Sequence, residues 1–132
     1  MTTSASGGTV SIRSPYAFAE TVQRLLSAFA SHSLKVFATI DQRAEAAAVG
    51  LKMPPATLVL FGNPRVGTPL MVEQPLSALD LPLKVLVTES SPGEVMVSFN
   101  AAAYIVGRHS LSAELLNNLV PAERVIAEAI TK

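Results

Sequence analysis

The spacing of apolar residues along the first part of the chain predicts a strand followed by a long helix. Val10 and Ile12 alternate with polar neighbours, as in a strand that has one solvated face. Ser14-Pro15 follows and combines a preferred N-cap with a residue that fits the first helical position. The next apolar residues form one helical stripe: Phe18, Val22, Leu25, Leu26 and Phe29. We therefore expect a helix that ends near His32 and covers a sheet.

The middle of the chain alternates again and then becomes apolar on both faces. The stretch LKVFATID, residues 34–41, predicts a second strand, and Asp41 is well placed to cap the alanine-rich segment after it. That short helix should stop at Gly50, where a left-handed C-cap residue costs little. The stretch TLVLF, residues 57–61, offers apolar side chains to both faces and so predicts a strand in the middle of the sheet.

The last part of the chain predicts a hairpin and then helices. Residues 83–89 and 94–99 are strand-like runs on either side of the turn-forming sequence SSPG, which indicates an antiparallel pair. One helix should end near Gly107, Ser112 can cap the next, and Pro121 can open the last. Because two strands follow each other directly, the order of elements favours an α+β fold with a mainly antiparallel sheet over a doubly wound parallel sheet.

Length and composition indicate one domain that associates with itself. The chain has 132 residues, 49% of them hydrophobic, which suffices for one packed core. Residues 1–7 are expected to form a disordered tail and residues 8–132 the domain. Only 15% of the residues are charged, which leaves little polar cover for a small monomer and favours a homodimer with a buried interface.

Charge and residue usage exclude several partners and kinds of site. Ten basic and ten acidic residues balance, and no Lys/Arg-rich run occurs, so neither nucleic acid nor a membrane surface is a favoured partner. The absence of cysteine rules out disulfides, thiolate nucleophiles and zinc fingers. The chain has no secretory signal pattern and no apolar run of about 20 residues, so we expect a cytoplasmic protein. The sequence identifies no cofactor and no set of metal ligands.

The corner FGNPRVGTPLM, residues 61–71, has two interpretations. In the first, Asn63, Arg65, Gly67 and Thr68 bind an anion, because free backbone N–H groups at a helix start and the guanidinium of Arg65 would form a cationic pocket. It is not a Walker loop, since no Gly-Lys-Ser/Thr follows. In the second it only starts a helix: Asn63 is the cap, Pro64 takes the first position, and Gly67 allows close packing. The structural interpretation is the simpler one.

Three ionisable residues are further candidates for function. Asp80 could be a general acid or base, and Lys84 its charge partner or an anion contact. His109, at a predicted helix end, could act as a base or bind a metal. Each also has a structural interpretation, because Asp before a strand often binds loop amides and His is favoured at helix C-termini, which applies to His32 as well.

Several of these stretches together resemble a known family. FGNP and GTPLM, LDLPLKVLV and VSFNAAAYIVGRH are similar to the bacterial and archaeal family called domain of unknown function 302, over roughly residues 8–130. The resemblance implies a curved antiparallel sheet of about five strands backed by a long helix, of the TATA-binding-protein-like class, and a homodimer, with no established activity. Relatives often have His where this chain has Gln42, so a role for that histidine does not carry over.

Three functions are compatible with the sequence, and each predicts a different site. The favoured one is a non-catalytic homodimeric domain that binds a small ligand or a protein partner in a cleft between the long helix and the sheet. The second is an enzyme in which Asn63, Arg65 and Thr68 hold a small anionic substrate while Asp80 or His109 moves protons. The third is a metal or haem accessory protein with His109 as ligand. A polar pocket that joins the corner to Asp80 and His109 would favour the enzyme, and an apolar cavity the binding module.

Two apolar clusters are candidates for the homodimer interface. They are residues 53–55, Met-Pro-Pro, and residues 70–72, Leu-Met-Val, both in segments expected to be loop or short helix. Methionine adapts well to contact surfaces. The alternative is that both clusters only cover the edge of the sheet.

Overall fold

The computed structural model describes residues 3–132, with side chains described from Gly7 onward. The strands are β1 (Thr3–Ser6), β2 (Thr9–Arg13), β3 (Lys35–Asp41), β4 (Ala56–Gly62), β5 (Leu83–Ser91) and β6 (Glu94–Asn100). The α-helices are α1 (Phe18–Ser31), α2 (Gln42–Ala48), α3 (Pro64–Glu73), α4 (Ala102–Arg108) and α5 (Leu116–Ala129). Two 3₁₀ turns, η1 (Pro75–Leu79) and η2 (Ala113–Leu115), complete the secondary structure.

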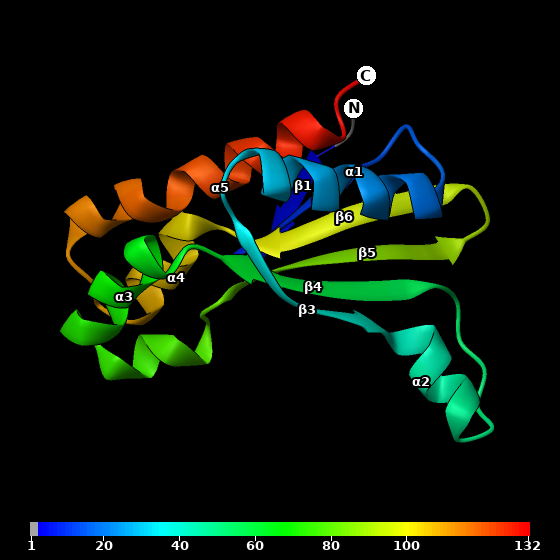
Figure 1. The fold of residues 1–132 in the computed structure, drawn as a ribbon, viewed down its shortest axis with the longest axis horizontal. Helices are drawn as coiled ribbons and strands as arrows, with labels where there is room; N and C mark the ends of the chain where they lie inside the picture. The colour runs from blue at the N-terminus through cyan, green and yellow to red at the C-terminus, as the bar shows by residue number, and fades with distance from the viewer. Residues whose placement is uncertain (1–2) are drawn as a thin grey trace.

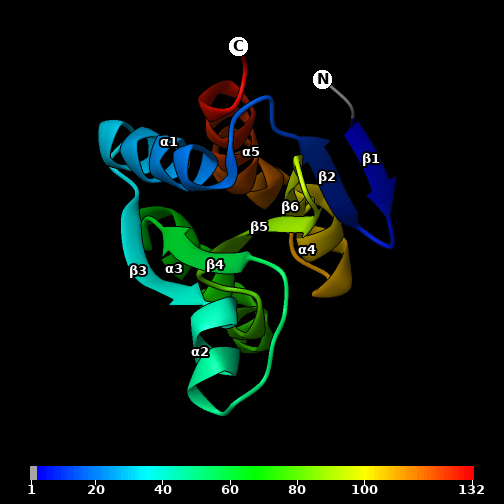
Figure 2. The same ribbon diagram turned by 90° about the vertical axis from the view of Figure 1, so that its right-hand side faces the viewer.

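All the strands of the described chain join one antiparallel sheet in the order β1-β2-β6-β5-β4-β3 (Figures 1 and 2). Helices α1 and α5 lie together on one side of this sheet (Figure 2). The predicted α+β class with an antiparallel sheet is therefore confirmed. The sheet has six strands where about five were expected, and it is backed by two helices of 14 residues each where one long helix was expected.

The main core lies between the sheet and helices α1 and α5. Phe29 of α1 stacks on Phe61 of β4 with ring centroids 4.1 Å apart and an interplanar angle of 9°. Neither ring is more than 1% exposed, and Ile126 of α5 is buried in the same cluster. Burying side chains of this kind stabilises a fold by about 1.5–3 kcal/mol each. The Phe29–Phe61 stack fixes the end of β4 against α1, and this end is where the Asn63 corner begins.

A second apolar cluster holds the remaining helices at one end of the sheet. Leu70 of α3, Ile105 of α4 and Leu119 of α5 are its fully buried members. Because the side chain of Leu70 is 0% exposed, it belongs to the chain's own core and not to the dimer interface expected for residues 70–72. The cluster sets α3 against the start of α5, which creates the groove described below.

Most local predictions for the middle of the chain are confirmed. Asp41 caps α2 by accepting a hydrogen bond from the backbone N–H of Ala44 at 2.9 Å. Gly50 follows that helix with φ +78, the left-handed conformation in which glycine is favoured. The predicted hairpin is formed by β5 and β6, whose backbones pair antiparallel.

The N-terminal segment differs from its prediction. Residues Thr3–Ser6, expected to belong to a disordered tail, form β1 and pair with β2. Gly7 and Gly8 adopt φ values of +58 and +87, so the chain turns back on itself at once and the backbone of β1 pairs with that of β2. Met1 and Thr2 lie outside the described residues.

Two predicted helix starts are wrong. Helix α1 begins three residues after Pro15, because the hydroxyl of Ser14 instead accepts from the N–H of Tyr16 at 3.1 Å and hydrogen-bonds the hydroxyl of Thr21 at 2.7 Å. Helix α5 begins at Leu116, so Pro121 lies inside it and does not open it. A proline ordinarily lies at the first position of a helix, but here Leu119 packs into the second cluster, and the helix therefore begins before Pro121.

Candidate functional site

The Asn63 corner is a capped helix start. The side chain of Asn63 accepts a hydrogen bond from the backbone N–H of Arg65 at 2.9 Å, and Pro64 is the first residue of α3. The backbone carbonyl of Asn63 accepts from the N–H groups of Val66 and Gly67 at 2.8 and 2.9 Å. The free amides on which the anion-binding interpretation depended are therefore already occupied, and that part of the expectation is wrong. The group of this corner that can still attract an anion is the guanidinium of Arg65, its one charged side chain.

A large open groove runs past this corner. Its volume is about 750 Å³, and its walls come from α3, the N-terminal half of α5, and the ends of α1, β3 and β4. Apolar side chains form most of the surface, and among them are Phe37, Val66, Leu81, Pro82 and Val125. Asn63, Arg65, Gly67 and Thr68 line one stretch of the groove, so four of the five predicted ligand-binding residues lie together there. Their role stays a prediction.

The charge among the described residues that line the groove is positive only. Arg65 is the only Lys or Arg among the lining residues of the described chain, and no Asp or Glu lines the groove. His32 lies at its edge, with its Nδ1 bonded to the carbonyl of Ala28 at 2.8 Å. Asn118 ties the two walls together, since its side-chain amide donates to the carbonyl of Val66 at 3.1 Å. Lys35 does not line the groove, but its Nζ lies 5.0 Å from the centroid of the Phe37 ring. The groove therefore combines an apolar body with one cationic lining residue, Arg65.

Asp80 lies at a different place and is already paired. The side chain of Arg108 donates to both carboxylate oxygens, at 2.9 and 3.1 Å, and Nε2 of His109 is 2.5 Å from Oδ2. The side chains of Asp80 and His109 are 11% and 7% exposed. The structure thus brings together the two predicted catalytic candidates, but as an ion-pair cluster that links the end of α4 to the start of β5.

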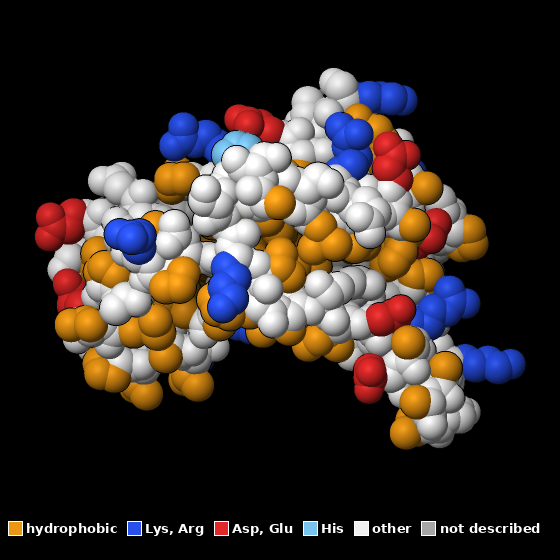
Figure 3. All heavy atoms as spheres, viewed as in Figure 1, with side chains coloured by type: hydrophobic (Ala, Val, Ile, Leu, Met, Phe, Trp, Pro, Cys, Tyr) orange, Lys and Arg blue, Asp and Glu red, His pale blue; other side chains and the backbone are white. Residues whose placement is uncertain are grey.

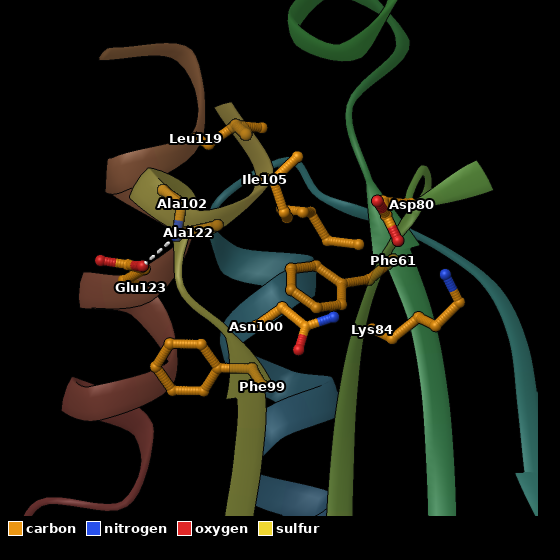
Figure 4. Close-up of a pocket in the computed structure, with 11 residues that line it drawn as sticks. Phe61, Asp80, Lys84, Phe99, Asn100, Ala102, Ile105, Leu119, Ala122 and Glu123 are labelled. Carbon is orange, nitrogen blue, oxygen red and sulfur yellow. Dashed lines mark hydrogen bonds between the residues drawn. The ribbon is translucent and has the colours of Figure 1, made fainter. Parts of the chain in front are cut away.

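The cavity beside Asp80 is too small for a substrate. Figure 4 shows Asp80 and Lys84 on one side of it and Glu123 on the other, with Phe61 and Ile105 between them. The volume is about 20 Å³, room for about one water molecule. The carboxylate of Glu123 is occupied, because it accepts from the backbone N–H of Ala102 at 2.6 Å. Lys84, the fifth predicted ligand-binding residue, lines this cavity and not the groove.

The polar pocket expected of an enzyme is therefore not formed by these residues. No member of the Asn63–Thr68 stretch lines the small cavity, and neither Asp80 nor His109 lines the groove. Leu83, Leu119 and Ala122 line both and form the wall between them. An apolar groove is present, but its walls come mainly from α3 and α5, whereas the binding module was expected to have its cleft between the long helix and the sheet. Ligand binding at this groove stays a prediction.

Sequence reasoning missed the groove residues that come from distant elements. Phe37 is 44% exposed on an edge strand, and Asn118 lies in a segment predicted only as a capped helix. An aromatic residue at an outer position of a strand gives a weak signal, but the partners across a groove are set by tertiary packing. Gln42, the residue that departs from the family pattern, begins α2 and lines neither the groove nor the cavity.

One exposed carboxylate near the groove is electrostatically distinct. Glu73, the last residue of α3, accepts from the hydroxyl of Ser112 at 2.7 Å and from its backbone N–H at 2.6 Å. These two bonds hold the pKa of Glu73 below its usual value of 4.5, and the bond from the hydroxyl has the larger effect. Ser112 therefore does not cap the following helix with its own side chain, as the sequence predicts, but is held by Glu73.

Neither a metal-ligand cluster nor a membrane-spanning helix is found in the part of the chain that the structure describes. No group of three His, Asp or Glu side chains among residues 3–132 is arranged to hold a metal ion. None of the helices in that range is both long and apolar enough to cross a bilayer.

Proteins similar to the chain include three curated relatives and a solved structure. Fluoride-specific ion channel FluC 1 of Brucella suis biovar 1 (strain 1330) is 38% identical over 104 residues, which are 79% of this chain and 41% of that protein. FluC 1 of Brucella abortus biovar 1 (strain 9-941) and FluC 2 of Brucella melitensis biotype 1 match equally, over 38% of their length. The chain thus spans about two fifths of these relatives.

The structural and family comparisons agree with each other. The crystal structure of an uncharacterized conserved protein DUF302 from Bacillus stearothermophilus matches with a TM-score of 0.78 and 18% identity, over 93% of this chain and 95% of that one. This similarity shows a shared fold. The family model described as domain of unknown function DUF302 matches residues 10–130. The chain belongs to the DUF302 family.

Proposed function

We propose that this chain is a non-catalytic binding module that takes a small ligand, with an apolar body and one anionic group, in the groove between α3 and α5. The observation that carries the proposal is the groove itself. Its volume of about 750 Å³ lies within the range of about 300–1,000 Å³ of small-molecule sites, and such sites are mostly apolar with few polar groups.

The preference for an anion rests on Arg65. This side chain is exposed and forms no ion pair with any described residue, while no carboxylate lines the groove to compete for it. Arginine binds carboxylates and phosphates through a planar fork of donors. A ligand whose apolar part contacts Phe37 and Val66 would bring its anionic end to the mouth of the groove at Arg65.

The non-catalytic character rests on the separation of the polar groups. The carboxylate of Asp80 is engaged by Arg108 and His109, and no lining residue of the groove is an acid or base other than His32 and Arg65. General acid–base catalysis needs such a group within hydrogen-bond reach of the substrate. Binding is therefore the activity that this arrangement supports best.

The test uses 1-anilinonaphthalene-8-sulfonate, an apolar aromatic anion that fluoresces when it leaves water. We expect saturable binding of one molecule per chain. The Gly67→Phe substitution should weaken the affinity about tenfold or more, because a Cβ at Gly67 would lie 4.0 Å from Leu81 Cδ1 within the groove and the ring would occupy ligand volume. Gly107→Phe is the matched control, since it adds the same ring to a helix where nothing lies within 4 Å of the new Cβ.

A second variant keeps the test decisive if Gly67→Phe disturbs folding. Arg65→Gln removes the positive charge but keeps an unbranched polar side chain at the groove, and it should weaken binding about two- to fivefold, the effect of an exposed ion pair of up to about 1 kcal/mol. Arg43→Gln on α2, which does not line the groove, should bind like the wild type. Equal affinities for Arg65→Gln and Arg43→Gln would refute the anionic preference, and unchanged affinity in Gly67→Phe would refute the groove as the site.

A second candidate function is an accessory role beside a fluoride channel. It is favoured by the Brucella relatives, which carry the name of a fluoride-specific ion channel and in which a segment similar to this chain is about two fifths of the protein. In that case fluoride would be the anion at Arg65. Sodium fluoride should then displace the probe where sodium chloride at equal ionic strength does not, and equal effects of the two salts would exclude this candidate.

A further inference from the structure

Two asparagine side chains in the groove are held in fixed orientations by the backbone of α3. Asn63 precedes α3 and Asn118 belongs to α5, and both are half-buried residues that line the groove. One end of the Asn63 amide bonds the N–H of Arg65 at 2.9 Å. One end of the Asn118 amide bonds the carbonyl of Val66 at 3.1 Å. The other end of each amide forms no hydrogen bond with a described residue.

The backbone partners determine which end of each amide remains for a ligand. A backbone N–H only donates, so Asn63 accepts with its Oδ1, and its Nδ2 group remains as a donor. A backbone carbonyl only accepts, so Asn118 donates with its Nδ2, and its Oδ1 remains as an acceptor. The groove therefore presents one side-chain donor and one side-chain acceptor, and neither amide can turn over without losing its bond to α3.

The donor and the acceptor belong to the same part of the groove. Their partners, Arg65 and Val66, are consecutive residues in the first turn of α3, so the two bonds lie within about one helical turn, roughly 5 Å along the axis. The guanidinium of Arg65 starts from the same turn and also lines the groove. A cation, a donor and an acceptor are thus grouped at the start of α3.

Apolar side chains from other elements line the rest of the groove. Among them are Phe37 of β3, Leu83 of β5 and Val125 of α5. Phe37 is 44% exposed and lies at the irregularity between Val36 and Ala38 in the pairing of β3 with β4, where a bulge redirects the side chain. Figure 3 shows apolar and basic side chains over α3 and the start of β3, with acidic side chains at the outer margin of this region. This part of the groove suits a hydrocarbon chain.

We propose that the ligand of the groove is an N-acyl amino acid, a molecule that joins an apolar acyl chain, a secondary amide and a carboxylate. The inference rests on the proposed function and names the chemistry of its ligand. The carboxylate binds the guanidinium of Arg65. The amide carbonyl accepts from Nδ2 of Asn63, and the amide N–H donates to Oδ1 of Asn118. The acyl chain lies against Phe37 and Val125.

A plain fatty acid matches the same groove less well. Its hydrocarbon chain would cover Nδ2 of Asn63 and Oδ1 of Asn118 without bonding either, and a polar group that is buried without a partner is costly. A secondary amide has one donor and one acceptor on a planar group, which matches the two asparagines in number and in kind. A site that hydrogen-bonds such a group also rejects the analogue that lacks it.

The test measures displacement of 1-anilinonaphthalene-8-sulfonate from the wild type by three ligands that differ near the carboxylate. N-octanoylglycine has the amide N–H, N-octanoylsarcosine has a methyl group in place of that hydrogen, and undecanoate has the same chain length without an amide. We expect N-octanoylglycine to bind about tenfold more tightly than either of the others, the effect of one hydrogen bond to the ligand.

Variants of the asparagines test the assigned contacts. Asn118→Ala removes the acceptor, so N-octanoylglycine and N-octanoylsarcosine should bind it alike. Asn63→Ser keeps a residue type that caps helices and should weaken both ligands about threefold while their difference persists. Asn117→Ala is the matched control, because Asn117 also lines the groove but is exposed, and it should keep the wild-type preference. Equal loss of the preference in Asn117→Ala and Asn118→Ala would overturn the assignment.

The outcomes distinguish this inference from the proposed function. The comparison of N-octanoylglycine with N-octanoylsarcosine on the wild type needs no substitution, so it decides even if Asn118→Ala does not fold. Equal or tighter binding of undecanoate or of 3-hydroxyundecanoate would overturn the amide inference and leave the groove as a site for apolar anions. Failure of all these ligands to displace the probe from the wild type would overturn both.

Discussion

The groove and the Asp80 cluster lie at the same end of the sheet, share a wall, and have opposite properties. The groove is large and mostly apolar, and its one guanidinium, on Arg65, has no acidic partner among the lining residues. The cluster is small and polar, and its carboxylate is bound by Arg108 and His109. Both contain residue types that are common in active sites. The two regions differ in whether their charged groups already have partners within the chain: the carboxylate of Asp80 has them, and the guanidinium of Arg65 can still bind a ligand.

This difference shows why residue type is a poor guide to function here. Asp80 and His109 were the catalytic candidates, yet each uses the other as a partner and the adjacent cavity has room for only about one water molecule. Arg65 was one basic residue in a helix start, yet among the described residues it is the one Lys or Arg that lines a volume large enough for a ligand. The three predictions that follow test this contrast, beginning with the wall between the two regions.

The largest expected effect comes from removing that wall. Leu119 is 2% exposed and lines both the groove and the small cavity, so Leu119→Ala should join the two volumes. We expect a loss of about 2–5 kcal/mol of unfolding free energy, the range for a buried leucine that leaves a cavity, measured by urea denaturation. Leu79→Ala on η1 is the control, since that side chain is 66% exposed and should cost little. A loss below about 1 kcal/mol would mean that the two regions are not separated by a packed wall.

An intermediate effect is expected from the cluster itself. Asp80→Asn removes the charge that binds Arg108 and His109, and hydrogen bonds to charged groups contribute about 1.5–3 kcal/mol each. We expect a loss of about 1–3 kcal/mol, with unchanged affinity for the fluorescent probe, because Asp80 does not line the groove. Arg108→Gln should cost less, about 0–1 kcal/mol, since its side chain is 46% exposed. Weaker probe binding without loss of stability would instead place Asp80 in the binding site.

The sequence predicted those parts of the molecule that depend on local signals. The strand periods, the Asp41 and Asn63 caps and the hairpin turn are each set by a few consecutive residues, and all are present. The starts of α1 and α5 were missed because tertiary partners, Thr21 for Ser14 and the second cluster for Leu119, outweigh the usual cap and proline signals. The groove could not be predicted, because its walls come from segments up to about ninety residues apart in the chain.

The smallest expected effect is a pH dependence at Glu73, which joins the end of α3 to the turn before α5 and so supports the groove from outside. Its folded pKa lies below the unfolded value of 4.5, because Ser112 donates two hydrogen bonds to the ionised carboxylate. Between the two values the unfolded state binds more protons, so stability rises with pH across that range. The contribution is complete above about pH 4.5 and is lost as the pH falls through the folded pKa.

The measurement compares thermal unfolding of wild type and Glu73→Gln from pH 3 to pH 7. The wild type should be the more stable protein at pH 7, and the difference should shrink toward zero below pH 4.5, since a protonated Glu73 resembles glutamine. The effect should be small, because the side chain is solvent-exposed and screened. Glu114→Gln removes a neighbouring charge without touching Ser112 and should leave the wild-type pH profile unchanged. A difference that persists undiminished at pH 3 would show that shape, and not the charge of Glu73, holds α3 against the start of α5.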